Sequence, residues 1–189
     1  MKTHLKLAAG FCGVVIGMAG SAGAQTAQKT AIDLFASVKP GQWVKIEGAI
    51  QKDFTLIAKE VKILTGDFQD DDWEIEAPIR RIADKAQKKY EVLLIPVKMQ
   101  DDATYESEDG SITSFDGLKT GLYVEIEGTY MKDGTFMGEE VQPQLEPEEP
   151  NVASLVGKAE KVDAAKKTIT LMGVTCQASE KTKVKSAVK

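Results

Sequence analysis

The sequence predicts an all-β protein made of two small β-barrels, one of them inserted between the two halves of the other. Three observations support this prediction. A strong internal repeat recurs at a spacing of 80 residues, apolar and polar side chains alternate within it, and a weaker second repeat recurs at the same spacing. Short alternating segments separated by turn signals are typical of β-sandwiches and barrels.

The strong repeat aligns residues 35–61 with residues 115–141 without a gap. Its core reads "PGQWVKIEG" at 40–48 and "TGLYVEIEG" at 120–128. The 12 identical positions among 27, numbered in the first copy, are Phe35, Lys39, Gly41, Val44, Ile46, Glu47, Gly48, Lys52, Asp53, Thr55, Glu60 and Val61. Apolar and polar residues alternate with a period of two in this core, which indicates a strand with one buried face.

Glycines and turn residues define the rest of this unit. Gly48 and Gly128 interrupt the first strand of each copy, and glycine inside a strand marks a bulge or bend that lets a sheet curl into a barrel. The segment "KDGT" at 132–135 is a strong hairpin signal. Its counterpart "KDFT" at 52–55 lacks the glycine, so we expect a looser turn or another type there, followed by a return strand.

The weaker repeat supplies further strands. "EIEAPIRRI" at 74–82 aligns with "SLVGKAEKV" at 154–162, with small residues at Ala77 and Gly157. If the later hairpin is three residues shorter, "VLLIPVKMQ" at 92–100 aligns with "ITLMGVTCQ" at 169–177. Each copy therefore predicts two or three strands joined by a turn rich in Lys, Asp and Ala.

These repeats predict the domain organisation. Residues 73–142 hold both repeat types and make one complete barrel, whereas 31–64 and 152–184 hold complementary halves. An isolated hairpin is marginally stable in water, so we expect the two halves to assemble into a discontinuous barrel. The acidic linkers 65–72 and 143–151 would then run side by side. The alternative pairs the halves between two molecules, which gives a swapped homodimer.

The N-terminal residues 1–24 have the pattern of a secretory signal peptide. Lys2 and Lys6 precede an apolar run at 7–19, and Ala22-Gly23-Ala24 follows it. The run is shorter than the ~20 residues of a membrane-spanning helix, so we expect cleavage after Ala24 and no transmembrane segment in the mature chain. The predicted location is periplasmic or secreted; the alternative is an uncleaved anchor.

Charge and composition exclude several classes of function. The net charge is −5, and removing residues 1–24 takes away two lysines and no acidic residue, which leaves −7. An acidic, exported surface disfavours binding to nucleic acid. Cleavage would also remove His4, which is the one histidine of the sequence. Nucleophile pairs with histidine, His-ligated zinc and haem are thereby excluded, and CxxC and phosphate-binding glycine motifs are absent. We therefore predict no cofactor and no metal.

The segment from "EIEAPIRRI" through "GLYVEIEGTYMKDGTFMGEEV" resembles a group of secreted bacterial domains catalogued as a domain of unknown function, which share a GxxVxVeG core. It is also similar to the periplasmic bacterial OB-fold group, in which a "WVxLEG" strand opens the barrel. The resemblance implies OB-like barrels for both units and a location outside the cytoplasm. It implies no catalytic residue, and the missing glycine at 52–55 and the split outer unit depart from it.

The candidate ligand-binding residues are Trp43, Tyr123, Glu47 and Glu127, because aromatic residues on the polar face of an OB-type barrel can form a binding platform. The structural alternative is that each aromatic side chain covers its own barrel or packs on the other unit. Cys176 is in phase with Val174, so we expect a buried, inert thiol. The acidic clusters at 70–72, 101–111 and 146–150 fit solvated loops, with calcium binding as the alternative.

These observations predict an exported, non-enzymatic binding or adaptor module of the bacterial envelope. Its partner would be an envelope protein or a small ligand. One alternative is a structural subunit of an envelope complex. Another is a carboxylate-based enzyme acting on glycans, which would need two carboxylates at a fixed separation in a cleft.

Overall fold

The computed structural model describes residue 35 and residues 37–188, and the predicted signal peptide lies outside these residues. Twelve strands and one short 3-10 helix, η1 (Phe115–Gly117), make up the described secondary structure, so the predicted all-β class is confirmed. No helix of the described chain is long and apolar enough to cross a membrane.

The strands have the following bounds: β1 (Trp43–Ile50), β2 (Leu56–Thr65), β3 (Trp73–Asp84), β4 (Lys89–Val92), β5 (Ile95–Tyr105), β6 (Tyr123–Tyr130), β7 (Phe136–Gln144), β8 (Val152–Lys158), β9 (Lys161–Asp163), β10 (Thr168–Leu171), β11 (Val174–Gln177) and β12 (Lys183–Val188).

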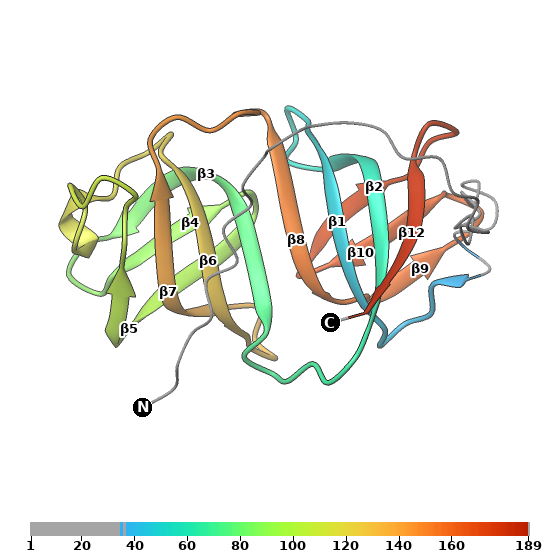
Figure 1. Cartoon of the computed structure of the whole chain (residues 1–189), viewed down its shortest axis with the longest axis horizontal. Helices are drawn as coiled ribbons and strands as arrows, with labels where there is room; N and C mark the ends of the chain where they lie inside the picture. The colour runs from blue at the N-terminus through green and yellow to red at the C-terminus, as the bar shows by residue number, and fades with distance from the viewer. Residues whose placement is uncertain (1–34, 36, 189) are drawn as a thin grey trace, which may run out of the picture.

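Strands β3 to β7 form a closed five-stranded barrel (Figure 1, left). The order β4-β5-β7-β6-β3 closes because β3 also pairs with β4. The long strand β3 makes closure possible: residues 73–78 pair with β6, and the part from Ile79 onward pairs with β4. The side chains of Ile75, Val97, Ile126 and Phe136 fill its interior.

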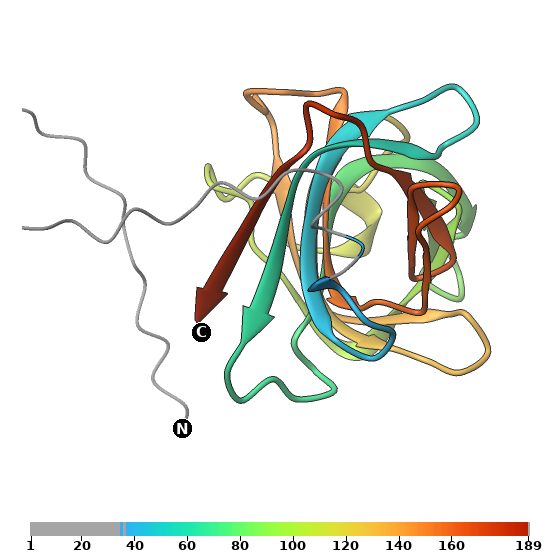
Figure 2. The ribbon, with the colours of Figure 1, turned by 90° about the vertical axis from the view of Figure 1, so that its right-hand side faces the viewer.

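The two ends of the described chain pair with each other in the other half of the molecule (Figure 1, right). Strand β1 lies between β2 and β8, and β2 pairs in parallel with β11 and β12 (Figure 2 shows β2 and β12 side by side). The pairing of β1 with β8 has the same register as the pairing of β6 with β3 in the closed barrel. Trp43 opposes Lys158 in the first pair, and Tyr123 opposes Pro78 in the second. Tyr123 is 80 positions after Trp43, and Pro78 is 80 positions before Lys158. Residues 43–65 and 152–188 therefore share one sheet.

The two halves are joined by antiparallel pairing of β3 with β8, in which Ile75 opposes Leu155. All strands thus belong to one continuous sheet. This joint corrects the expectation that the linkers run side by side. Because β3 and β8 are antiparallel, their first residues stand at opposite ends of the joint. Figure 1 shows the connection 66–72 at one end and 145–151 at the other.

The predicted bulges lie at the two repeated glycines. The pairing shifts register between Glu47 and Gly48, and again between Glu127 and Gly128. A Cβ atom on Gly48 would lie 2.7 Å from the carbonyl oxygen of Ile57, and one on Gly128 would lie 2.1 Å from that of Met137. Both positions require glycine because the neighbouring strand passes too close for a side chain.

The turn at 52–55 has the same hydrogen bonds as its counterpart, so the expectation of a looser or different turn is wrong. Phe54 N–H donates to Gln51 O at 2.9 Å, as Gly134 N–H donates to Met131 O at 3.0 Å. Phe54 takes the left-handed φ of 64° that glycine normally adopts. The guanidinium of Arg80 lies 4.5 Å from the centre of the Phe54 ring, within the range of a cation–π contact.

The alignment of the second repeat also needs a correction. Leu93 and Met172 both have positive φ and both open a two-residue turn, which makes the offset of this hairpin 79 residues rather than 77. Val92 therefore corresponds to Leu171, and Ile95 to Val174. A turn at residues 93–94 interrupts the aligned segment 92–100. No glycine, asparagine or proline stands in this turn, and the Leu93 side chain is buried (2% exposed).

Candidate functional site

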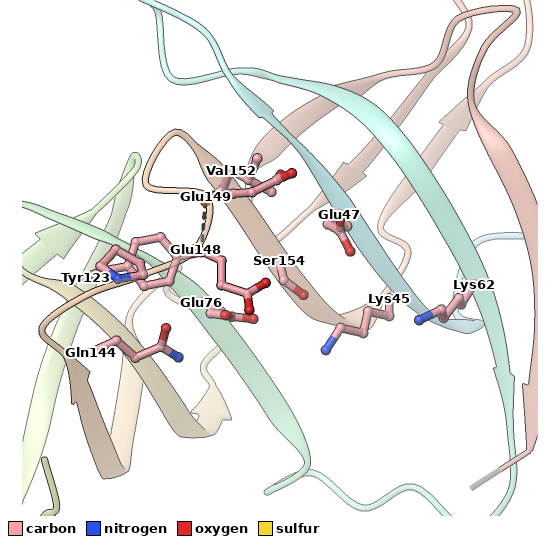
Figure 3. Close-up of a pocket in the computed structure, with 11 residues that line it drawn as sticks. Lys45, Glu47, Lys62, Glu76, Tyr123, Gln144, Glu148, Glu149, Val152 and Ser154 are labelled. Carbon is pink, nitrogen blue, oxygen red and sulfur yellow. Dashed lines mark hydrogen bonds between the residues drawn. The ribbon is translucent and has the colours of Figure 1, made fainter. Parts of the chain in front are cut away.

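A groove lies on the outer face of the continuous sheet, between the two halves and beneath the connection from β7 to β8 (Figure 3). It encloses about 530 Å³. We call it the acidic groove. Its lining residues are Lys45, Glu47, Lys62, Glu76, Tyr123, Gln144, Pro147, Glu148, Glu149, Val152 and Ser154.

Strand pairing arranges the outward side chains at the groove floor and beside it in two parallel rows, of which Lys45, Glu47, Glu76 and Ser154 line the groove. Alternate side chains of β1, β8, β3 and β6 point outward, so residues opposed across the strands stand side by side. One row runs across the four strands as Lys45, Val156, Glu74 and Glu127. The neighbouring row runs as Glu47, Ser154, Glu76 and Glu125. The second row thus holds three carboxylates around one serine.

Both lysines of the groove are already paired. Lys45 Nζ lies 3.2 Å from Glu74 Oε1, so this ion pair spans β8 above Val156. Lys62 Nζ lies 3.1 Å from Glu60 Oε1. Among the described residues, Glu47 and Glu148 form no ion pair. The groove therefore keeps an excess of negative charge.

Ser154 is the most unusual polar residue of the groove floor. It is only 4% exposed, and its Oγ has no hydrogen-bond partner within the described chain. A buried hydroxyl without a partner costs free energy, and buried polar groups in folded proteins are nearly always satisfied. The hydroxyl extends from β8 into the space between Glu76 and Glu47 (Figure 3).

Burial and neighbouring carboxylates raise the pKa values of Glu76 and Glu125. Burial is the main cause of the raised pKa of Glu76, and the nearby charges of Glu74 and Glu47 add to it, while Lys45 and a hydrogen bond from Gln144 oppose it. Burial, together with Glu74 and Glu76, raises the pKa of Glu125 to about 7. A positive charge in the groove would relieve this repulsion.

The same carboxylates also affect the pKa of Lys45, where they favour the charged form. Burial lowers its pKa, but attraction to Glu74, with smaller contributions from Glu76 and Glu125, outweighs burial and leaves the pKa raised. The ammonium of Lys45 is therefore charged at neutral pH, and its neighbouring carboxylates favour this charged form.

The predicted site residues do not form one platform. Tyr123 is buried (6% exposed) and donates its hydroxyl to Val152 O at 2.9 Å, which agrees with the structural alternative that it packs on the other unit. Trp43 lies at the opposite end of the joint, stacked on Phe68 and tilted against Trp73, each with ring centres 5.1 Å apart. The two aromatic residues instead pack on the other half of the chain or on a linker.

The predicted acidic residues lie on the outer face but in different rows. Glu47 lines the acidic groove, whereas Glu127 is exposed on β6, opposite Glu74 and Glu140. Of the four predicted residues, the structure therefore brings Glu47 and Tyr123 to one cavity.

The remaining candidates are structural. Cys176 is 1% exposed, and burial raises the pKa of its thiol to about 12. Asp70 pairs with Lys158 at 2.8 Å, and Glu149 pairs with Lys59, so two of the acidic stretches contact the body of the protein. Within residues 37–188, no three acidic or cysteine side chains converge in a way that could hold a metal ion.

The family of the protein follows from comparison with family models. A model described as "Domain of unknown function (DUF5666)" matches residues 23–62 and 76–142, which together are more than half of the chain. The chain belongs to this family. This result confirms the resemblance to a domain of unknown function. No curated protein and no solved structure matches the sequence.

The two matched segments of the family correspond to different parts of the fold. One covers β1 and most of β2, and the other covers nearly all of the closed barrel. The match ends before β8, although β8 supplies Ser154 and the floor of the acidic groove. The groove is therefore built partly from a segment outside the family match.

Sequence reasoning missed Lys45, Glu76 and Ser154 as site residues. The alternation in "EIEAP" could have placed Glu74 and Glu76 on one outer face. No sequence signal distinguishes Ser154, because its role depends on strands β1 and β3 that flank β8 from distant parts of the chain.

Proposed function

We propose that the protein is an exported, non-enzymatic binding module of the bacterial envelope that holds its ligand in the acidic groove. One observation carries this proposal: the buried hydroxyl of Ser154 has no partner and lies between the carboxylates of Glu47 and Glu76. A bound ligand would supply the missing hydrogen bond.

The proposed architecture consists of two OB-like units. In it, residues 73–142 form the inserted unit, and residues 31–64 with 152–184 form the discontinuous one. The shared register of β1 with β8 and of β6 with β3 supports this division. Such an arrangement explains why the groove lies between the halves, where neither half could build it alone.

The chemistry of the groove favours binding over catalysis. Its polar side chains are four carboxylates, two paired lysines, one glutamine, one serine and one tyrosine, and Pro147 and Val152 complete the lining. A Ser–His pair is excluded for Ser154 after cleavage at residue 24, because no histidine occurs after that residue. The Cys176 thiol is buried in the core.

Site-specific photo-crosslinking in the native envelope tests the location of the ligand. A photoreactive residue replaces Glu148, which extends over the groove, and in a matched variant it replaces Glu146 of the same connection, which does not line the groove. We expect a discrete adduct from position 148 and none from position 146. Equal adducts from both positions, or none from position 148, would contradict the proposed site.

A further inference from the structure

We infer that the acidic groove binds a primary alkylammonium group, held above Ser154 between the carboxylates of Glu47 and Glu76. This inference rests on the proposed function, because it names the chemistry of the ligand for the same groove. The ammonium could belong to a lysine side chain of a partner or to a free amine, and the experiment below distinguishes these sources.

The neighbouring row of the sheet provides an internal precedent. There, the residues of β1 and β3 that flank β8 are Lys45 and Glu74, and the lysine ammonium spans Val156 to reach the glutamate at 3.2 Å. One row further along β8, the flanking residues are Glu47 and Glu76, so both sides are acidic. The second row has the carboxylates of such a bridge but lacks its cation.

The geometry of the second row matches the donors of an ammonium group. Adjacent strands lie about 4.8 Å apart, so Glu47 and Glu76 arise roughly 10 Å apart, with Ser154 between them. An alkylammonium has three N–H donors and no acceptor. Two carboxylates and the Ser154 oxygen can accept one hydrogen bond each, which would satisfy both the ligand and the orphan hydroxyl.

The charges around the site favour a cation over an anion. Lys45 and Lys62 already have carboxylate partners, so neither needs a negatively charged ligand. Glu148 adds another carboxylate from the connection above the floor, and its side chain extends toward Ser154 (Figure 3). Burial is the main cause of the raised pKa of Glu76, and the charges of Glu74 and Glu47 add to it, so a cation beside this carboxylate would favour its ionised form.

An organic cation fits better than an inorganic one. A divalent metal requires several oxygen ligands about 2.0–2.6 Å from one point. Among the described residues, no three suitable side chains converge in this way. The carboxylates instead stand on opposite sides of a serine, an arrangement that suits directional N–H donors.

The test is a titration of the full-length mature chain, followed by backbone amide chemical shifts. The probes are spermidine and the peptide acetyl-Gly-Lys-Gly-amide. The same peptide with an acetylated lysine serves as the neutral control, and magnesium chloride at equal ionic strength controls for screening. We expect saturable shifts at Glu47, Glu76 and Ser154 with an ammonium probe and none with either control. The ammonium probe that binds more tightly identifies the source.

Variants make the test specific. Glu76→Gln should weaken binding about tenfold or more, because it removes a charged hydrogen-bond acceptor. Ser154→Ala should weaken binding several-fold while leaving the unfolding midpoint unchanged or higher, since the hydroxyl lost has no partner. Glu108→Gln removes the same charge from an exposed loop outside the groove. This control variant should bind the ammonium probe as tightly as the parent protein does.

The outcomes separate this inference from the proposed function. Groove shifts with the acetylated peptide alone would overturn the ammonium inference and leave a binding groove in place. Equal shifts with magnesium chloride would overturn the ammonium inference, because they would show that the shifts come from charge screening alone. Absence of groove shifts with all probes would overturn it as well, whereas the photo-crosslinking result would still decide whether the groove has any ligand.

Discussion

Ile75 and Leu155 oppose each other in the antiparallel joint of β3 and β8, and they are 80 positions apart, the same spacing as the internal repeat. Each residue therefore pairs with its own counterpart, which is the signature of a two-fold relationship between the halves. The relationship also places Glu74 opposite Val156 and Glu76 opposite Ser154. The two rows of the groove floor thus occupy equivalent positions but differ in chemistry.

Gly157 is predicted to be essential for the joint between the halves. A Cβ atom at this position would lie 2.2 Å from the ring of Trp73, which also packs on Trp43 and Tyr130. Gly157→Ala should lower the free energy of unfolding by about 1–3 kcal/mol through overpacking and should alter tryptophan emission. Chemical denaturation followed by fluorescence measures both.

The matched control for this substitution is Gly41→Ala. No atom lies within 4 Å of a Cβ built on Gly41, although its φ of 85° disfavours alanine. It should cost about 1 kcal/mol of backbone strain and leave the emission spectrum unchanged. An unperturbed spectrum in Gly157→Ala would show that the Trp73 contact is unimportant.

Protonation of Glu125 should make the protein more stable at mildly acidic pH than at pH 8. Its pKa is raised to about 7 by burial and by Glu74 and Glu76, compared with 4.5 in the unfolded chain. Between these values the folded state binds more protons, so the free energy of unfolding increases as the pH falls from 8 to 5.

Glu125→Gln should stabilise the protein at pH 8 by roughly 1–2 kcal/mol, after discounting the full linkage value for partial exposure, and the gain should vanish near pH 5. Thermal unfolding across this range measures it, and Glu108→Gln serves as the control. A gain of the same size at both pH values would refute a titration effect.

Phe54 and Arg80 should be energetically coupled. The guanidinium lies 4.5 Å from the ring centre, and the ring sits on a residue with a φ of 64°. A double-mutant cycle of Phe54→Gly and Arg80→Ala should give a coupling energy of about 0.5–2 kcal/mol. Additive effects of the two substitutions would mean that the contact does not stabilise the turn.

Cys176 should contribute to packing alone. Because the thiol is 1% exposed and its pKa is raised to about 12, it should react with a thiol reagent only after unfolding. Cys176→Ser should cost about 1–3 kcal/mol, since it buries a more polar group, and should leave groove binding unchanged. Loss of binding in a folded Cys176→Ser protein would reveal a role for the thiol.

The strands of the strong repeat were predictable because alternation and glycine report directly on a curled sheet. Val44 and Ile46 point inward, and Gly48 lies at the bulge, as their pattern indicates. Local turn chemistry was less informative. Phe54 and Leu93 adopt left-handed conformations that are typical of glycine, and the side chains that they contact, Arg80 for Phe54 and the core for Leu93, come from other parts of the chain.

The acidic groove could be predicted only in part. The position of Glu47 on the polar face of its strand predicts it as a site residue. Ser154 is a candidate only because β1 and β3 lie on either side of β8. Those pairings join segments about 80 and 110 residues apart, and no local pattern encodes their register. The burial of Tyr123 could not be predicted for the same reason, because it depends on Val152 of the other half.

Amide hydrogen exchange on a protein that lacks residues 152–189 tests most directly whether the two chain ends build one unit. The deletion removes β8 to β12, so β1 and β2 keep only their pairing with each other, whereas the closed barrel of β3 to β7 keeps all of its own pairings. We predict rapid exchange throughout residues 43–65 and protection throughout 73–144. Full protection of 43–65 in a truncated protein shown to be monomeric would contradict a unit assembled from both ends of the chain.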